Sequence, residues 1–179
     1  VIRAQFNKVL VSVNKELALD NDPIPDDVEI AIMPPYSGGS GLPTIVRITE
    51  EELDQNWLVR QLVSERCGTV CTFTGVVRGK TQRGKPFMTE ALEYEAYTEM
   101  AEEKMLQIAR EIRERWSEVE GIGILQRVGH LTPGMVAALV ACSGGHRDSG
   151  VFEAARYGIE RLKEIVPIWK KEIGPEGAL

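Results

Sequence analysis

The 179-residue chain has little that suits a membrane span, a secreted scaffold or a histidine-rich metal centre. Its longest uninterrupted apolar run, Met135 to Cys142, is far shorter than the roughly 20 residues that cross a bilayer. The 3 cysteines are odd in number and do not suit a disulfide framework, and the 2 histidines argue against a catalytic metal site. No basic-then-apolar segment opens the sequence. We therefore expect a cytoplasmic protein that binds no membrane.

Positive charge is also in the minority. Lys and Arg number 21 against 27 Asp and Glu, so the formal net charge is 21 − 27 = −6. This balance argues against a nucleic-acid-binding function but leaves room for a local basic pocket. We expect the cysteines to be small core residues and the tryptophans to pack rather than bind bases; these residues are Cys67, Cys71, Cys142, Trp57, Trp116 and Trp169.

The first 39 residues are rich in strand patterns. Alternating or apolar segments predict short strands over 8–13, 17–19 and 28–33. Pro34 and Pro35 then stop sheet pairing, and Gly38 and Gly39 give a tail thin enough to thread a narrow channel. Three short strands are too few for an independent domain, so this segment needs missing sequence or a partner surface.

Strands and helices alternate in the remainder of the chain. The spacing of apolar residues and of turn signals predicts strands over 44–48, 69–78, 89–96, 122–128 and 135–142, and helices over 49–65, 98–116 and 152–166. Thr49 with Glu52 matches a capping box at the first helix. The order predicts an α+β fold with a largely antiparallel sheet covered by helices.

A basic run follows the strand over 69–78. Arg78, Lys80, Arg83 and Lys85 occur there without an acidic residue. Such a loop can clamp an anion, because arginine presents a bidentate fork to phosphate. The same run also fits a solvated hairpin loop.

A glycine-rich turn joins the last strand of the series to the last helix. In Ser143-Gly144-Gly145-His146-Arg147, backbone N–H groups and a helix N-terminus can receive an anion, and His146 can exchange a proton near neutral pH. A plain loop with a histidine at the helix end fits equally well.

The third basic motif lies at the end of that helix. Lys163 flanks the apolar stripe, where partial desolvation would free its amine as a base or nucleophile. Pro167 redirects the chain, so Lys170 can face back toward Lys163. The alternative is a pair of lysines that snorkel around a core Trp169.

Several of these stretches resemble a known enzyme family. Residues 69–177 resemble the large, catalytic subunit of molybdopterin synthase, through TFTGVVRG (72–79), LEYEAY (92–97), RVGHLTPG (127–134), HR (146–147), FEAARYGIERLK (152–163) and VPIWKKE (166–172). Residues 8–39 resemble the C-terminal half of the small subunit, a ubiquitin-like sulfur carrier with a Pro-Pro-x-x-Gly-Gly ending.

The resemblance implies a fold and a domain order. We expect a partial β-grasp segment over 1–39, a linker over 40–43 and an α/β hammerhead-type catalytic domain over 44–179. The family's catalytic subunits form a homodimer with a carrier at each end, as a heterotetramer.

The resemblance also implies a reaction. The carrier ends in a glycine thiocarboxylate, and two such sulfurs are placed on cyclic pyranopterin monophosphate to give the dithiolene of molybdopterin. No cofactor or metal ion is implied. A phosphorylated substrate is consistent with a cationic pocket inside an acidic protein.

Roles in that reaction follow by position in the motifs. The resemblance implies that Lys163 and Lys170 are catalytic. It implies substrate contacts for Val76, Val77, Arg78, His146, Arg147, Lys163, Lys170, Lys171 and Glu172, with Gly38 and Gly39 as the carrier tail. We hypothesise that Lys163 acts as an acid/base or a transient amine partner near the thiocarboxylate.

One departure from the family concerns the tail. Gly39 is followed by Ser40, and a thiocarboxylate cannot form at an internal peptide bond. We therefore expect either cleavage after Gly39 or a separate carrier protein.

Two other classes of function compete with sulfur transfer. A non-catalytic ubiquitin-like docking module would explain Gly38-Gly39 but not three basic motifs. A phosphoryl-transfer enzyme ranks last, because the sequence has no Walker-type loop and no obvious carboxylate pair for a metal.

Overall fold

The computed structural model describes residues 10–13, 16–17, 30–33, 42–81, 87–175 and 177–178, and the chain divides into two compact units, Val1–Tyr36 and Ser37–Leu179. In the first unit, strands β1 (Leu10–Val13), β2 (Glu16–Leu17) and β3 (Ile30–Met33) form an antiparallel sheet in the order β2-β1-β3. The predicted strands over 8–13 and 28–33 are confirmed in part, and the second strand begins one residue earlier than predicted. The β-grasp assignment stays a prediction, and Gly38 and Gly39 lie outside the described residues.

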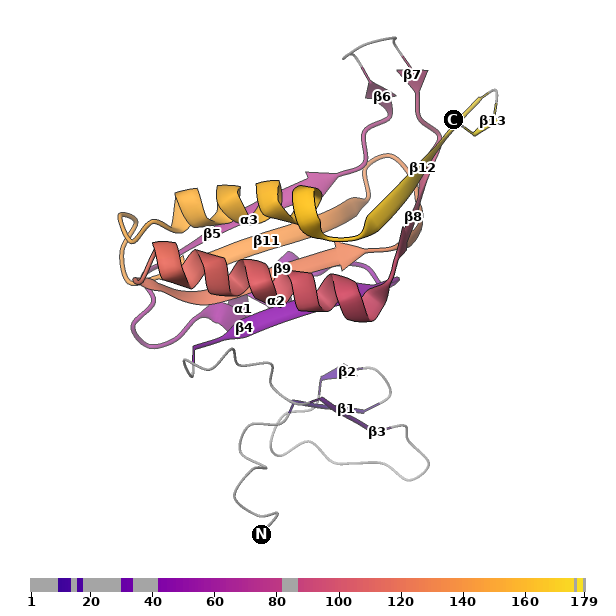
Figure 1. Cartoon of the computed structure of the whole chain (residues 1–179). Helices are drawn as coiled ribbons and strands as arrows, with labels where there is room; N and C mark the ends of the chain where they lie inside the picture. The colour runs from indigo at the N-terminus through magenta and orange to yellow at the C-terminus, as the bar shows by residue number, and fades with distance from the viewer. Residues whose placement is uncertain are drawn as a thin grey trace. The chain divides into compact units, whose positions relative to one another are not determined.

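The second unit is built on a four-stranded mixed sheet. Its order is β4 (Thr44–Thr49), β9 (Val119–Arg127), β11 (Val136–Gly144) and β5 (Thr69–Val76), with β4 parallel to β9 and the other pairs antiparallel. Helices α2 (Thr98–Arg115) and α3 (Val151–Ile165) lie side by side over one face (Figure 1). The short helix α1 (Gln55–Leu62) packs on β9 and β11 from the other face. The predicted α+β class is confirmed, with one parallel pair.

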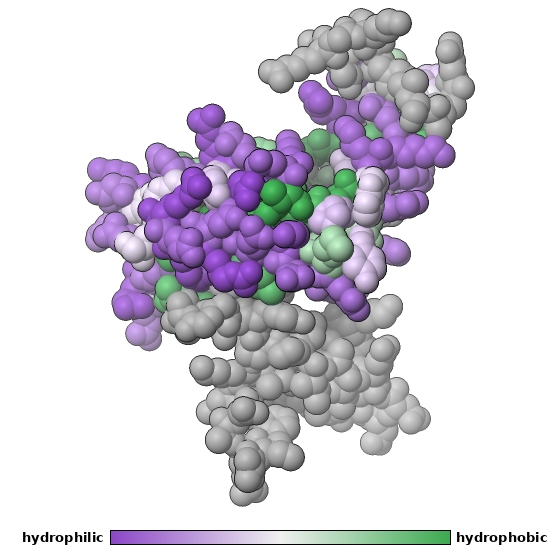
Figure 2. Space-filling view, in the orientation of Figure 1, coloured by the Kyte–Doolittle hydropathy of each residue, from purple (hydrophilic) through white to green (hydrophobic). Residues whose placement is uncertain are grey.

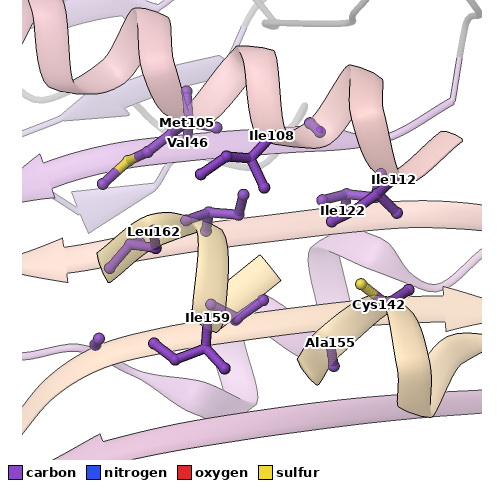
Figure 3. Packing of buried hydrophobic residues seen from close by; sticks show 14 of the residues in the cluster. Val46, Met105, Ile108, Ile112, Ile122, Cys142, Ala155, Ile159 and Leu162 are labelled. Carbon is purple, nitrogen blue, oxygen red and sulfur yellow. The ribbon is translucent and has the colours of Figure 1, made fainter. Parts of the chain in front are cut away.

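Alternation along β9 and β11 explains why both faces of this sheet are covered. Ile124 and Val140 point into the cluster beneath α2 and α3, which Figure 3 shows together with Met105 and Ile159 on those helices. Leu125 and its neighbours on that face pack with α1 instead. Strands buried on two faces are apolar at nearly every position, and this accounts for the apolar run from Met135 to Cys142.

A second sheet extends from the first. Its order is β10 (Gly129–Leu131), β8 (Ala91–Ala96), β12 (Ile168–Gly174) and β13 (Gly177–Ala178), all antiparallel, and a two-stranded hairpin of β6 (Lys80–Thr81) and β7 (Phe87–Met88) precedes it. Sequence reasoning missed β12. Lysine or glutamate occurs on both of its faces, so no apolar alternation marks it.

Three local predictions are wrong. Helix α1 begins after Asp54, whose carboxylate accepts a 2.9 Å hydrogen bond from the Trp57 amide, while Thr49 only closes a turn to Glu51. Trp169 is 60% exposed because it lies on the outward face of β12. Cys67 is not an apolar core residue, since its thiol lies 3.3 Å from the Glu120 carboxylate.

Polar contacts join α2 to α3 on their outer face. Glu111 accepts hydrogen bonds from the Arg161 guanidinium at 2.9 Å and from the Tyr157 hydroxyl at 2.6 Å. These bonds stabilise the carboxylate and lower the pKa of Glu111 to about 2. Hydrophilic side chains cover most of this helical face (Figure 2). Within the described ranges, no helix is both long and apolar enough to cross a bilayer.

The close approach of α3 to β11 makes a testable prediction. A Cβ added at Gly158 would lie 2.7 Å from Cγ1 of the fully buried Val140. Gly158→Ala should therefore lower the free energy of unfolding by about 1–3 kcal/mol, although alanine is the better helix former. Denaturant unfolding measures this change, with the exposed Glu160→Ala as the control within 0.5 kcal/mol. Equal stabilities would show that the helix moves away from the sheet at no cost.

Candidate anion-binding site

The end of β5 positions the first group of predicted residues. Val77 is buried, and its backbone is fixed on both sides: its N–H donates to the Met135 carbonyl at 2.9 Å, and its carbonyl accepts from the Gly134 N–H at 2.9 Å. Val76 is 49% exposed, and Arg78, which follows this anchored point, is exposed. The sequence thus places the Arg78 guanidinium next to a backbone segment that two hydrogen bonds hold. The basic loop residues Arg83 and Lys85 lie outside the described residues.

The second group of predicted residues lies on β12, and its members are divided between the two faces of that strand. In the sheet register, Lys170 lies opposite Tyr94, and Glu172 lies opposite Leu92. Leu92 and Tyr94 pack with Val77, so Lys170 and Glu172 share the face of the sheet that meets the end of β5.

Lys171 lies on the opposite face of this sheet. It pairs with Glu93, which in turn pairs and forms a hydrogen bond with His130. Side chains that alternate along a strand point to opposite sides, so Lys171 does not share a surface with Lys170. Lys171 therefore does not lie beside Tyr94 and Leu92, the neighbours that Lys170 has on its own face.

A chain of hydrogen bonds joins β12 to the residue after Arg78. The Gly79 carbonyl accepts a 3.1 Å bond from the Thr89 amide, and the buried Thr89 hydroxyl donates to the Glu172 carboxylate. Glu172 is therefore held in place from the β7–β8 connection. Thr89 thus joins the segment after β5 to β12, although Gly79 and Glu172 are more than 90 residues apart in sequence. The sequence motifs did not reveal this role of Thr89.

Lys163 lies in the last turn of α3, at the end of the helix from which β12 leaves (Figure 1). It is exposed, so burial within this chain does not desolvate its amine as predicted. The helix packs on β5 and runs back along β11, so its C-terminal end lies over the Val76 end of β5. Lys163, Arg78 and Lys170 thus belong to one end of the second unit.

None of these three cations forms an ion pair with any residue that the structure describes. Two arginines of α3, in contrast, do form ion pairs: Arg156 pairs with Glu160 at 3.0 Å, and Arg161 pairs with Glu111 at 2.9 Å. In an acidic protein, cations left without carboxylate partners at one end are available to an anionic ligand.

His146 and Arg147 lie at the other end of this unit. They are exposed in the turn between β11 and α3, where the Gly144 carbonyl accepts a 3.0 Å bond from the Gly68 amide just before β5. From Thr69 to Val76, β5 spans about 23 Å at ~3.3 Å per residue. From Val151 to Lys163, α3 spans about 18 Å at ~1.5 Å per residue. One chain therefore does not bring His146 and Arg147 to Arg78 and Lys163.

The chemistry of the Lys163 end is anion binding with proton transfer. It offers two amines, a guanidinium and a fixed carboxylate. Across the described ranges, no group of three or more His, Cys, Asp or Glu side chains could hold a metal ion. Tyr94, which faces Lys170 and Glu172, is a further polar side chain that the sequence motifs did not reveal, because it lies inside an otherwise ordinary strand pattern.

Comparisons with known proteins agree on one family. Residues 48–165 match the family described as MoaE protein. A molybdopterin synthase catalytic subunit from Halalkalibacterium halodurans is 45% identical over 132 residues, which cover 74% of this chain and 81% of that protein. A protein of the same name from Staphylococcus epidermidis is 48% identical over 116 residues, or 65% of this chain and 74% of the relative.

Solved structures show the same fold. A crystal structure of molybdopterin synthase from Staphylococcus aureus matches with a TM-score of 0.67 and 43% identity, over 73% of this chain and 92% of that chain. A chain from the complex of subunits 1 and 2 of the molybdopterin-converting factor of Helicobacter pylori matches with a TM-score of 0.60 at 20% identity, over 75% of this chain and 88% of that chain. The second likeness supports the fold alone.

Proposed function

The chain belongs to the MoaE protein family, and on that premise we propose the reaction that it performs. It is a catalytic subunit of molybdopterin synthase and acts in molybdopterin biosynthesis. The proposed reaction moves sulfur from the C-terminal glycine thiocarboxylate of a small carrier protein to cyclic pyranopterin monophosphate, which becomes the dithiolene of molybdopterin.

The observation that best supports this reaction is the group of cations without a described carboxylate partner at the Lys163 end of the second unit. Lys163 lies on α3, Lys170 lies on β12 and Arg78 lies in the connection after β5, and none of the three has a carboxylate partner among the described residues. Arginine suits the phosphate of the substrate, and the two amines suit the charge that develops when a thiocarboxylate reacts. Lys163 and Lys170 are the proposed catalytic groups, and the backbone at Val76 and Val77 holds Arg78 toward the substrate.

His146 and Arg147 enter the proposal through a second copy of the chain. In their own subunit, the length of β5, about 23 Å, separates them from Arg78. In a two-fold dimer, the same surface of each copy meets its counterpart. When the two-fold axis is perpendicular to a strand at the interface, one end of that strand lies against the other end of its copy. An antiparallel meeting of two such units would bring one copy's His146 and Arg147 to the other copy's Arg78 and Lys163.

Strand β5 is the edge that suits this meeting. It is the last strand in the order β4-β9-β11-β5, so one side of its backbone pairs with no described strand. Phe73 and Val76 on it are 37% and 49% exposed, respectively. A long apolar edge strand is a ready template for pairing with another chain. The homodimer inferred from the resemblance would thus complete each site with two residues of the partner copy.

The small-subunit partner is also part of the proposal. The complex of subunits 1 and 2 from Helicobacter pylori, a fold relative of this chain, is consistent with such a partner. We further propose that residues 1–39 are a carrier-like segment, supported by the Pro34-Pro35 to Gly38-Gly39 ending. Since Gly39 precedes Ser40, sulfur would be loaded only after cleavage there or onto a separate carrier.

A reconstituted assay tests the reaction. The purified chain is incubated with cyclic pyranopterin monophosphate, with and without a separately prepared thiocarboxylated carrier, and molybdopterin is measured. Mass spectrometry of the same samples reads whether the chain is intact or cleaved after Gly39. Product that depends on added carrier supports sulfur transfer with a separate donor. Product without it, in a cleaved preparation, supports the first 39 residues as donor.

The docking-module alternative makes a different prediction in the same samples. A platform without catalysis would bind the carrier, form no molybdopterin and show no affinity for cyclic pyranopterin monophosphate in calorimetry. That result would remove the proposed function.

A further inference from the structure

We propose that the hydroxyl of Tyr94 is a further substrate-binding group of this site, a neutral hydrogen-bond donor to the anionic part of the pterin substrate. The inference rests on the proposed function and adds a residue to it. Tyr94 is the third residue of the motif LEYEAY (92–97), and neither the motif nor the comparisons specify its role.

The sheet register places Tyr94 beside Lys170. It lies in the middle of β8, directly opposite Lys170 of β12 on one side and opposite Gly129 of β10 on the other. Its ring packs with Val77 and the buried Leu92 and Leu131. The side chain therefore lies on the surface that carries Lys170 and Glu172, beside the segment that leads to Arg78.

The surroundings keep the phenol protonated. Partial burial and the nearby charge of Glu172 both raise the pKa of Tyr94 above its ordinary value near 10. A neutral phenol donates a hydrogen bond, and no described residue accepts one from it. Lys170 and Arg78 supply charge to an anion, and Tyr94 adds a directional donor beside Lys170.

A packing role is the structural alternative to a substrate contact. The ring of Tyr94 packs with Val77, Leu92 and Leu131. Phenylalanine would keep this packing, so the two roles separate at the hydroxyl.

The test compares Tyr94→Phe with Tyr97→Phe. Tyr97 is 55% exposed at the start of α2 and serves as the matched control from the same motif. We expect Tyr94→Phe to lower kcat/KM for cyclic pyranopterin monophosphate by about 10- to 100-fold, the cost of one hydrogen bond to a charged group. Tyr97→Phe should match the wild type. Calorimetry with the same substrate and the full-length chain reads binding independently of turnover.

Unchanged melting temperature with weaker binding and lower kcat/KM supports the proposal. Wild-type binding and kinetics in Tyr94→Phe would overturn it, and so would a loss of activity that follows a lower melting temperature. Failure of the wild-type chain to make molybdopterin would count against the proposed function instead. The binding comparison still decides whether Tyr94 contacts the substrate.

Discussion

Lys163→Ala is expected to reduce sulfur transfer by at least about 100-fold, a loss typical of removing a proton-transfer or charge-stabilising group. Lys163 stands in the last turn of α3, exposed and without a carboxylate partner among the described residues. Because it is exposed and no hydrogen bond or ion pair joins it to a described residue, the melting temperature should stay within about 2 °C of the wild type. Single-turnover kinetics with a thiocarboxylated carrier measures the effect.

Two companion variants define the role of this amine. Arg156→Ala is the matched control, since Arg156 lies on the same helix but is paired with Glu160, and it should leave the rate within about twofold. Lys163→Arg keeps the positive charge but gives up the transferable proton. Activity near zero in Lys163→Arg indicates acid/base or amine chemistry, and substantial activity indicates charge alone. Near-wild-type turnover in Lys163→Ala would remove this residue from the mechanism.

Two inactive variants are expected to restore activity to each other when combined in one dimer. If each site uses Lys163 from one copy and His146 from the other, a heterodimer of Lys163→Ala and His146→Ala contains one intact site and one doubly altered site. Such a heterodimer should show roughly half of the wild-type activity, because the two-fold symmetry provides two equivalent sites. Co-expression with two different affinity tags, followed by tandem purification, isolates this species.

The matched control combines Lys163→Ala with Lys170→Ala. Both residues lie at the same end of one subunit, so every site of that heterodimer lacks one amine and should be inactive. Restored activity only in the first combination requires a site shared between copies. Inactivity of both combinations would mean that Lys163 and His146 act within one chain. A His146→Ala homodimer that is itself active would mean that His146 has no role.

Local sequence signals predicted much of this fold for a physical reason. The apolar stripe of α3 and the apolar runs of β9 and β11 are periodic because each element buries one or both faces. Such patterns depend on spacing along the chain alone. The start of α1 was wrong because two side chains competed as caps, and Asp54, not Thr49, reaches an unpaired helix amide.

The site was predictable only in part. Arg78, Lys163 and Lys170 were found from the basic motifs and the resemblance, and the structure places them at one end of the second unit. The resemblance implies substrate contacts for both Lys170 and Lys171, and the sheet register places these two residues on opposite faces. The positions of Tyr94 and Thr89 beside the candidate site were missed because they come from cross-strand neighbours rather than from sequence neighbours.

The sequence by itself therefore determined the class of fold, the family and the kind of chemistry, since each depends on residue types and on periodicity. The tertiary structure decided which cations share a surface. It separated His146 and Arg147 from Lys163 by the length of α3, and it joined Thr89 to Glu172 across two strands. Residue spacing along the chain gives the length of each helix or strand, but the packing of helices and sheets decides which of their ends lie together.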